Sequence, residues 1–466
     1  MSRFFPLFAC LFCASLQAAP DPFDVESGIA APCPQPGGMA APEAPLGLAE
    51  VIDLALCRNP KTRAAWANAR IEASLAGAAQ ASYLPSLAGD VGGRRQRSRT
   101  EGESAQTVRQ GSANLSLSYL LFDFGGRAAN LENRRQLLNA AIAQQDVTRQ
   151  AVFLEALQAF YQVHAQTAAL EAAKASEAAA EKSFRAADAR HRAEVATPAD
   201  KLQAQTAFSQ ASLNRIRIEG QLRNAQGTLA NVIGLDAHQA VRLEDPGAAL
   251  AGALSGNGSG SAPDFSARLD ALIAFAKAQR PDLAAAEARY QAAKAAVDVA
   301  RSQGLPTLNL SAASGRQRSD GLDSRSGSLN VTLNIPLFTG FSTSYQIRAA
   351  EARLEASAIE QEQLAQQASL DVWQAWQALR TATQSLESTA DLLASAEASE
   401  RVALGRYQAG VGNILDVLNA QSALADARMQ RIAAAYDWNI NRAALASALG
   451  TLDKRLLDES FTFAAP

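Results

Sequence analysis

Two stretches of the chain are long enough, and free enough of helix-breaking residues, to fix its architecture. Neither glycine nor proline occurs between Gly126 and Pro198, or between Gly340 and Gly405. Both stretches are rich in alanine and other helix-forming residues, so each predicts one uninterrupted helix. At about 1.5 Å per residue, such a helix is a rod of roughly 100 Å. Rods of that length predict long helices packed side by side rather than a globular core.

The two long stretches belong to two copies of one unit. A constant offset along the chain carries Pro60 onto Pro281 and Leu84 onto Leu305. Beyond the first predicted strand pair, a slightly shorter constant offset aligns Leu121 with Leu337, Val195 with Val411, Asp200 with Asp416, and Gly234 with Gly450. A register that is kept over most of each copy indicates an internal duplication.

This duplication sets the domain organisation that we expect. The segments are a signal peptide at 1–18, a Pro-rich leader at 19–46, a first repeat at 47–236, a linker at 237–265, a second repeat at 266–452 and a tail at 453–466. Within the repeats we expect strands at about 86–98, 109–122, 307–319 and 326–338, and longer helices at about 125–193, 198–233, 340–409 and 413–449. The signal peptide has a basic start, an apolar run and small residues before cleavage after Ala18, so we expect export.

Two cysteines remain after the signal peptide, Cys33 in the leader and Cys57 in the first repeat. An exported chain permits a disulfide between them, which would tie the leader to the first helix. Two unpaired thiols are the alternative.

Two of the predicted strands alternate strictly between apolar and polar residues, a third alternates over the shorter stretch "TLNLSAAS", and the segment 87–91 does so more weakly. In "SANLSLSYLLF" the apolar positions include Leu115 and Leu117, and in "SLNVTLNIPLF" they include Leu329 and Val331. Strands of about ten residues with this alternation are typical of outer-membrane barrels, although a small soluble sheet with one wet face alternates in the same way. Four strands cannot close a barrel, and open edges are not tolerated in lipid, so a barrel requires oligomerisation. Arginines in the hairpin loops could then pair with lipid headgroups, or simply be solvated.

Other function classes find little support in the sequence. The net charge of −3 gives no basis for nucleic-acid binding. The histidines, His164, His191 and His238, lack the spacing of a zinc site, and no phosphate loop or nucleophile elbow occurs. We therefore expect no enzyme, no cofactor and no metal.

The sequence resembles the TolC family of outer-membrane channel-tunnels over nearly the whole mature chain. The likeness lies in "LFDFGGR" and "PLFTGF" where strand meets helix, in "RYQAGVGNILDVLNAQSALADA" at the second turn, and in the ending "SALGTLD". The resemblance implies an α+β membrane protein that forms a homotrimer. Four strands from each protomer would build a twelve-stranded barrel in the outer membrane of a Gram-negative bacterium, and helical hairpins would build a tunnel in the periplasm.

The resemblance also assigns roles to the two helical turns. Asp200 and Tyr407 correspond to a closing link between neighbouring hairpins, and Asp416 to a ring of carboxylates that would favour cations. Gly412, Asn419, Glu194 and His191 depart from the family's pattern, so the closed state would depend on an Asp200–Tyr407 hydrogen bond and packing at the turns. The expected docking residues for a periplasmic adaptor are Val195, Ala196, Thr197, Val411, Gly412 and Asn413.

Turn chemistry alone explains several of these residues equally well. Gly405, Gly410 and Gly412 would end the long helix, while Thr197 and Asn413 would cap the next helices with Asp200 and Asp416 three places on.

Three functions follow from these expectations. The likeness of "SALGTLD" and the lack of a cysteine directly after the cleavage site favour the exit duct of a type I (ABC transporter) exporter, such as one that secretes a repeat-in-toxin protein. Multidrug efflux with a resistance-nodulation-division pump is the alternative. A periplasmic structural coiled coil would leave the amphipathic strands unexplained.

Overall fold

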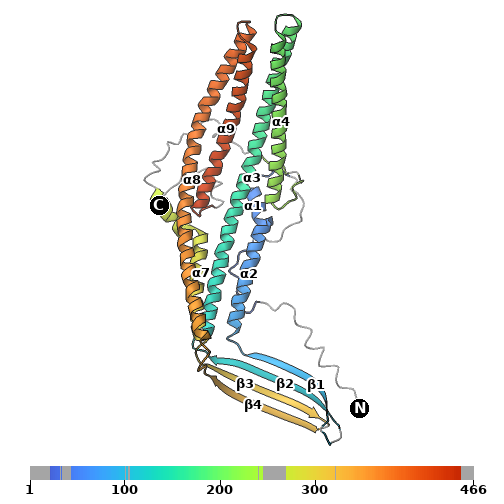
Figure 1. The fold of residues 1–466 in the computed structure, drawn as a ribbon, viewed down its shortest axis with the longest axis vertical. Helices are drawn as coiled ribbons and strands as arrows, with labels where there is room; N and C mark the ends of the chain where they lie inside the picture. The colour runs from blue at the N-terminus through green and yellow to red at the C-terminus, as the bar shows by residue number, and fades with distance from the viewer. Residues whose placement is uncertain are drawn as a thin grey trace. The chain divides into compact units, whose positions relative to one another are not determined.

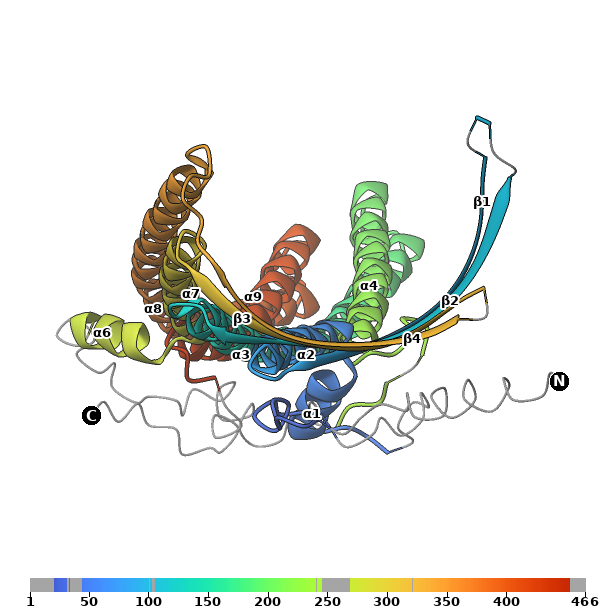
Figure 2. The same ribbon diagram turned by 90° about the horizontal axis from the view of Figure 1, so that it is seen from below.

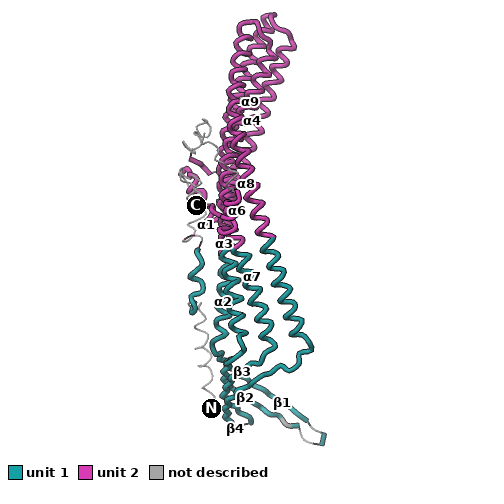
Figure 3. The backbone as a smooth tube through the Cα atoms, turned by 90° about the vertical axis from the view of Figure 1, so that its left-hand side faces the viewer, with its two compact units in different colours: residues 1–30, 67–143, 284–362 teal, residues 31–66, 144–283, 363–466 magenta. Residues whose placement is uncertain are grey.

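A computed structural model of the protein describes residues 21–31, 33, 44–99, 101–102, 105–239, 241–244, 269–320 and 322–452. The expected signal peptide, the expected tail and most of the expected linker lie outside these residues. The chain divides into two compact units, coloured in Figure 3. Unit 1 holds the described residues of 1–30, 67–143 and 284–362, and unit 2 those of 31–66, 144–283 and 363–466. None of the helices in the described ranges is long and apolar enough to cross a bilayer.

The helices and strands follow the same order in both copies (Figure 1). The first copy holds α1 (Leu48–Arg58), α2 (Pro60–Ala81), β1 (Ser86–Ser98), β2 (Gln106–Phe122), α3 (Gly126–Arg192) and α4 (Pro198–Val232). The second copy holds α6 (Leu269–Gln279), α7 (Pro281–Ser302), β3 (Thr307–Ser319), β4 (Leu322–Asn334), α8 (Ser342–Gln408) and α9 (Ile414–Ala448). β4 ends before the expected limit near 338, because Pro336 has no amide hydrogen to donate to a ladder.

Unit 1 contains the sheet, whose strands lie in the order β1-β2-β3-β4 with every neighbour antiparallel. Figure 2 shows that the strands curve together as one sheet. Leu117 of β2 pairs with Leu87 of β1 and with Ala312 of β3, which pairs in turn with Leu329 of β4. Residues that pair directly share a face. Away from the hairpin ends, one face therefore carries apolar side chains on all four strands, while serine, asparagine and threonine dominate the other.

Helices that carry mainly alanine at their contacts complete unit 1. Val297 and Ala300 of α7 are buried against Ala350 of α8. The Asn133 side chain of α3 donates to the Ala292 carbonyl oxygen of α7 at 2.7 Å. Small side chains let the helix backbones approach closely, which matches the alanine-rich composition of the long stretches.

The two largest hydrophobic clusters among the described residues of unit 2 lie where its short helices pack on the long ones. The larger cluster brings Ile52 of α1, Phe153 and Phe160 of α3 and Leu229 of α4 together. The smaller cluster packs Ala276 of α6 and Trp376 of α8 against Leu445 of α9 and against Leu449, the residue that follows α9.

The internal duplication is also visible in the hydrogen bonds that cap the C-terminal ends of α4 and α9. Asn59, which precedes α2, donates to the Val232 carbonyl oxygen at 2.9 Å. Arg280, which precedes α7, donates to the Ala448 carbonyl oxygen at 3.3 Å. The two acceptors are matched positions of the repeat, and both lie among the last carbonyls of a helix, which have no partner within the helix itself.

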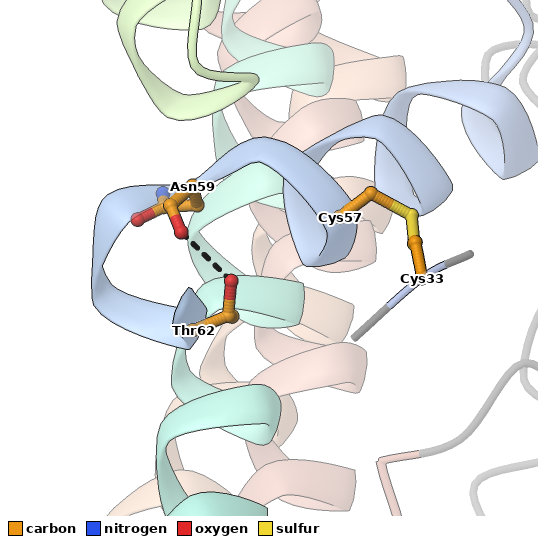
Figure 4. The surroundings of a disulfide bond; sticks show 4 residues. All are labelled: Cys33, Cys57, Asn59 and Thr62. Atoms are coloured by element: carbon orange, nitrogen blue, oxygen red, sulfur yellow. Dashed lines mark hydrogen bonds between the residues drawn. A yellow bond between two sulfur atoms is a disulfide. The ribbon is translucent and has the colours of Figure 1, made fainter. Parts of the chain in front are cut away.

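A disulfide joins the leader to α1 (Figure 4). Cys33 and Cys57 are bonded, with their Cα atoms 5.4 Å apart. Beside them, the Thr62 hydroxyl donates to the Asn59 carbonyl oxygen at 2.8 Å and fixes the corner between α1 and α2. Of the two sequence alternatives, the structure holds the disulfide.

Candidate functional site

The candidate site lies in unit 2, where two turns close the hairpins α3–α4 and α8–α9. In the first turn, the amide of Val195 donates to the Arg190 carbonyl oxygen at 3.0 Å, and the amide of Glu194 to that of His191 at 3.0 Å. The second turn repeats both bonds at matched positions, from Val411 to Arg406 at 3.0 Å and from Gly410 to Tyr407 at 3.1 Å. This pair of bonds is the Schellman motif, which satisfies the last carbonyls of a helix.

The two turns differ at the residue that must adopt a left-handed backbone. Gly410 has a φ of 78°, which glycine adopts without a steric penalty. Glu194 occupies the matched position with a φ of 60°. A residue with a Cβ atom is strained by about 1–2 kcal/mol in this conformation.

The glycines of the second turn divide their roles differently from the sequence expectation. Gly405 does not end α8, because the helix continues to Gln408 and the backbone reverses at Gly410. Gly412 is needed for close approach, since a Cβ atom there would lie 2.9 Å from the Tyr407 amide nitrogen.

The caps of α4 and α9 also differ. Thr197 and Asp200 form a reciprocal capping box, in which the Asp200 amide donates to Thr197 Oγ1 at 3.2 Å and the Thr197 amide to Asp200 Oδ2 at 3.0 Å. In the second turn Asn413 caps α9 by accepting the Leu415 amide at 3.2 Å. The Asp416 side chain is exposed at the start of α9. The carboxylate of Asp200 is therefore engaged in a cap, whereas that of Asp416 faces solvent in the protomer.

A cation–π contact joins the two hairpins beside these turns. The guanidinium of Arg190 in α3 lies 4.4 Å from the ring centroid of Tyr407 in α8. Tyr407 is buried and packs with Ile414 and Val417 of α9. An open hollow of about 250 Å³ lies here, and its walls include Arg190, Asp200 and Tyr407. Farther along the hairpins, Ser183 donates to Gln421 at 3.2 Å, so polar contacts connect them at more than one level.

A small charge network holds the first hairpin together. Asp188 of α3 lies 2.6 Å from Arg192 and 2.8 Å from Lys201 of α4. The hydrogen bond from Lys201, helped by the charge of Arg192, lowers the pKa of Asp188 below its ordinary value, although partial burial opposes this shift. The carboxylate thus stays ionised and bridges the two helices.

The structure gathers most of the residues that the sequence singled out. Asp200 and Tyr407 line one hollow, with Ala196, Gly412 and Asn413 beside them. Val195 and Val411 project outward, with 72% and 70% of their surfaces exposed. Sequence reasoning missed Arg190, Asp188 and Lys201. Arg190 aligns with Arg406 in the internal repeat, but nothing in that alignment indicates that the Arg190 side chain contacts the ring of Tyr407.

Comparison with known proteins places both turns inside a matched region. Residues 51–235 and 272–451 match the family described as outer membrane efflux protein. The chain is 32% identical to protein CyaE of Bordetella pertussis, over 95% of this chain and 91% of that protein. It is 28% identical to the outer membrane efflux protein BepC of Brucella suis, over 87% of this chain and 86% of that protein. The solved structure of CusC, described in connection with transmembrane channel formation, superposes with a TM-score of 0.75 at 21% identity, over 90% of this chain and 97% of that chain.

Proposed function

The chain belongs to the outer membrane efflux protein family, and we propose that three copies form the exit duct of a tripartite export system. Members of this family are passive channels of the outer membrane, not enzymes, and the chain has their fold. The observation that supports assembly from several copies is the open sheet, and the number three is that of the family. β1 and β4 are its edge strands, and its apolar face is continuous across all four strands. In lipid, unpaired edges are not tolerated, so the edges of one protomer need those of its neighbours.

We propose that the paired turns form the gate of the duct. Arg190 stacked on Tyr407 fixes the two hairpins of one protomer, and the hollow beside Asp200 can receive a contact from a neighbouring hairpin. Asp416 carboxylates, one from each protomer, would form a ring that favours cations. Exchanging Asp416 for asparagine should therefore move the reversal potential in a salt gradient toward that of an unselective pore.

The exposed turn residues support a docking role in the same proposal. Val195 and Val411 present apolar surface at the matched corners of the two hairpins. Together with Ala196, Thr197, Gly412 and Asn413 they would meet a periplasmic adaptor protein, which links the duct to an inner-membrane pump.

For the cargo, we propose protein export with an ABC transporter, supported by the likeness of the ending "SALGTLD" to type I exporters. Drug efflux is the second candidate, supported by the name of the Brucella relative. Deleting the gene separates the two: loss of a secreted protein with unchanged drug tolerance supports the first, and the reverse result supports the second.

Planar-bilayer conductance of the purified protein, with its oligomer mass measured on the same sample, tests the duct itself. Discrete channels from a trimer support the proposal. A monomer or dimer without channel activity would contradict it and favour a periplasmic coiled-coil role.

A further inference from the structure

The strands carry seven arginines, and six of them lie on the face that also carries the apolar side chains. The register shows this directly, because Arg95 pairs with Arg109 and Arg316 pairs with Ala113 and Arg325. The arginine cluster comprises Arg95, Arg97, Arg109, Arg316, Arg318 and Arg325. All six are exposed and lie toward the hairpin ends of the strands. The seventh, Arg94, points to the opposite, polar face.

Two glycines open a gap within this cluster. Gly93 pairs directly with Gly111, between the apolar pair Val91–Ala113 and the charged pair Arg95–Arg109. A Cβ atom built at either glycine would meet nothing within 4 Å. We call this bare patch of backbone the glycine notch. On the β3 side, Arg318 pairs with Gly111 and so closes the notch.

The described residues balance the charges around the notch only in part. Arg95 faces Arg109, and Arg316 faces Arg325, and like charges directly opposite each other on a sheet are destabilising. Asp323 on β4 compensates Arg316 at 2.6 Å and Arg318 at 3.7 Å. The Asp320 carboxylate accepts the backbone amide of Arg109 at 3.0 Å. Among the described residues, no ion pair reaches the guanidinium of Arg95 or Arg109.

From this arrangement we propose that the arginine cluster and the glycine notch bind the phosphate of an anionic outer-membrane lipid. Guanidinium groups bind phosphate through two parallel hydrogen bonds, and one phosphate between Arg95 and Arg109 would turn their repulsion into attraction. The site continues the apolar face, so the acyl chains of the same lipid would lie along Leu87 and Leu117. This inference needs the sheet to span the outer membrane, but it does not depend on the cargo or on the gate.

The test uses the whole purified protein in nanodiscs of phosphatidylcholine, with or without bisphosphorylated lipid A. Native mass spectrometry counts the lipid A molecules that the protein retains. Replacing both Arg95 and Arg109 with glutamine should weaken retention roughly 30-fold, since each basic residue near an anionic surface contributes about 1 kcal/mol. Gly93→Val keeps every charge but fills the notch, and should also weaken retention. Arg94→Gln, one residue away on the other face, is the matched control and should change nothing.

Further experiments identify which part of the lipid is bound and exclude a loss of channel assembly as the cause of weaker retention. Dephosphorylated lipid A should not be retained. Inorganic phosphate should not displace bound lipid A, because the acyl chains also hold the lipid on the apolar face. Bilayer conductance of each variant establishes that the channel has assembled, so a failed duct and a failed lipid site give different results. Equal retention by the Arg95/Arg109 double variant, or an equal loss in Arg94→Gln, would overturn the proposal. Displacement by inorganic phosphate alone would reduce the site to an anion site without lipid specificity and would overturn the lipid assignment.

Discussion

At the scale of single residues, the two turns share one backbone conformation but differ in their side chains. Glu194 holds the left-handed position that Gly410 holds in the other copy. We expect Glu194→Gly to stabilise the end of α3 by about 1 kcal/mol, because the strain of a Cβ atom disappears. Amide hydrogen exchange at residues 190–195 should slow about fivefold. Gly410→Ala is the mirror control: exchange at the end of α8 should accelerate by a similar factor, and no change in either variant would refute the strain.

Asp200 has a role in a cap and a proposed role in the gate, and the two can be separated. Thr197→Ala and Asp200→Ala each break the capping box, so both should loosen the start of α4 by about 1 kcal/mol. Only Asp200→Ala also removes the carboxylate from the hollow beside Tyr407. We therefore expect a raised single-channel conductance in Asp200→Ala and an unchanged one in Thr197→Ala. Equal conductance in both variants would leave Asp200 as a cap alone.

At the scale of elements, the corner before α7 shows how charge fixes a helix end. Arg280 contacts Asp282 at 2.7 Å and Asp371 at 3.0 Å, with only 13% of its side chain exposed. Although partial burial alone would raise the pKa of Asp282, the hydrogen bonds and charge of Arg280 lower it overall. A carboxyl group whose pKa is lowered in the folded state stabilises the fold at any pH above its ordinary pKa. That stabilisation is lost as the pH falls through the lowered pKa.

Arg280→Met should therefore lower the free energy of unfolding by about 2 kcal/mol at neutral pH. This loss is smaller than that expected when one partner of a fully buried ion pair is removed. Thermal unfolding followed by circular dichroism should show the difference, which should narrow as pH falls below the ordinary value of 3.8. The exposed pair of Arg301 and Glu351 offers a control. Arg301→Met should cost no more than about 0.5 kcal/mol. A difference between Arg280→Met and the parent that persists unchanged at acid pH would contradict the charge explanation.

Elements were also the scale at which the sequence was most informative. The absence of glycine and proline over two long stretches predicts α3 and α8, and the alternation of apolar and polar residues predicts the strands. Both patterns follow from local backbone geometry. The expected end of α8 near 409 lies one residue from the observed end at Gln408, but Gly405 lies within the helix and does not help to end it, since a glycine within a helix and one beyond its end look alike in sequence. Contacts between distant segments, such as Arg190 with Tyr407, depend on how the hairpins pack, and a single sequence does not encode that packing in any local pattern.

At the scale of the whole molecule, we propose that the duct meets its adaptor at the exposed corners of the turns. Gly412 is a poor probe of this contact, because any side chain there would press on the backbone of α8 and disturb the turn itself. Val411 is a better one, since 70% of its surface is exposed.

We expect Val411→Trp to abolish export while the trimer and its level in the outer membrane stay normal, because a bulky ring would block the docking surface. Export is measured in the native host as both protein secretion and drug tolerance, so the result does not depend on the cargo. Val402→Trp on α8, at a residue with 62% of its surface exposed, is the matched control and should export normally. A photo-crosslinker at position 411 should capture a periplasmic protein that position 402 does not. Normal export with tryptophan at position 411 would place the docking surface elsewhere, whereas loss of the trimer would show that the turn is needed for assembly.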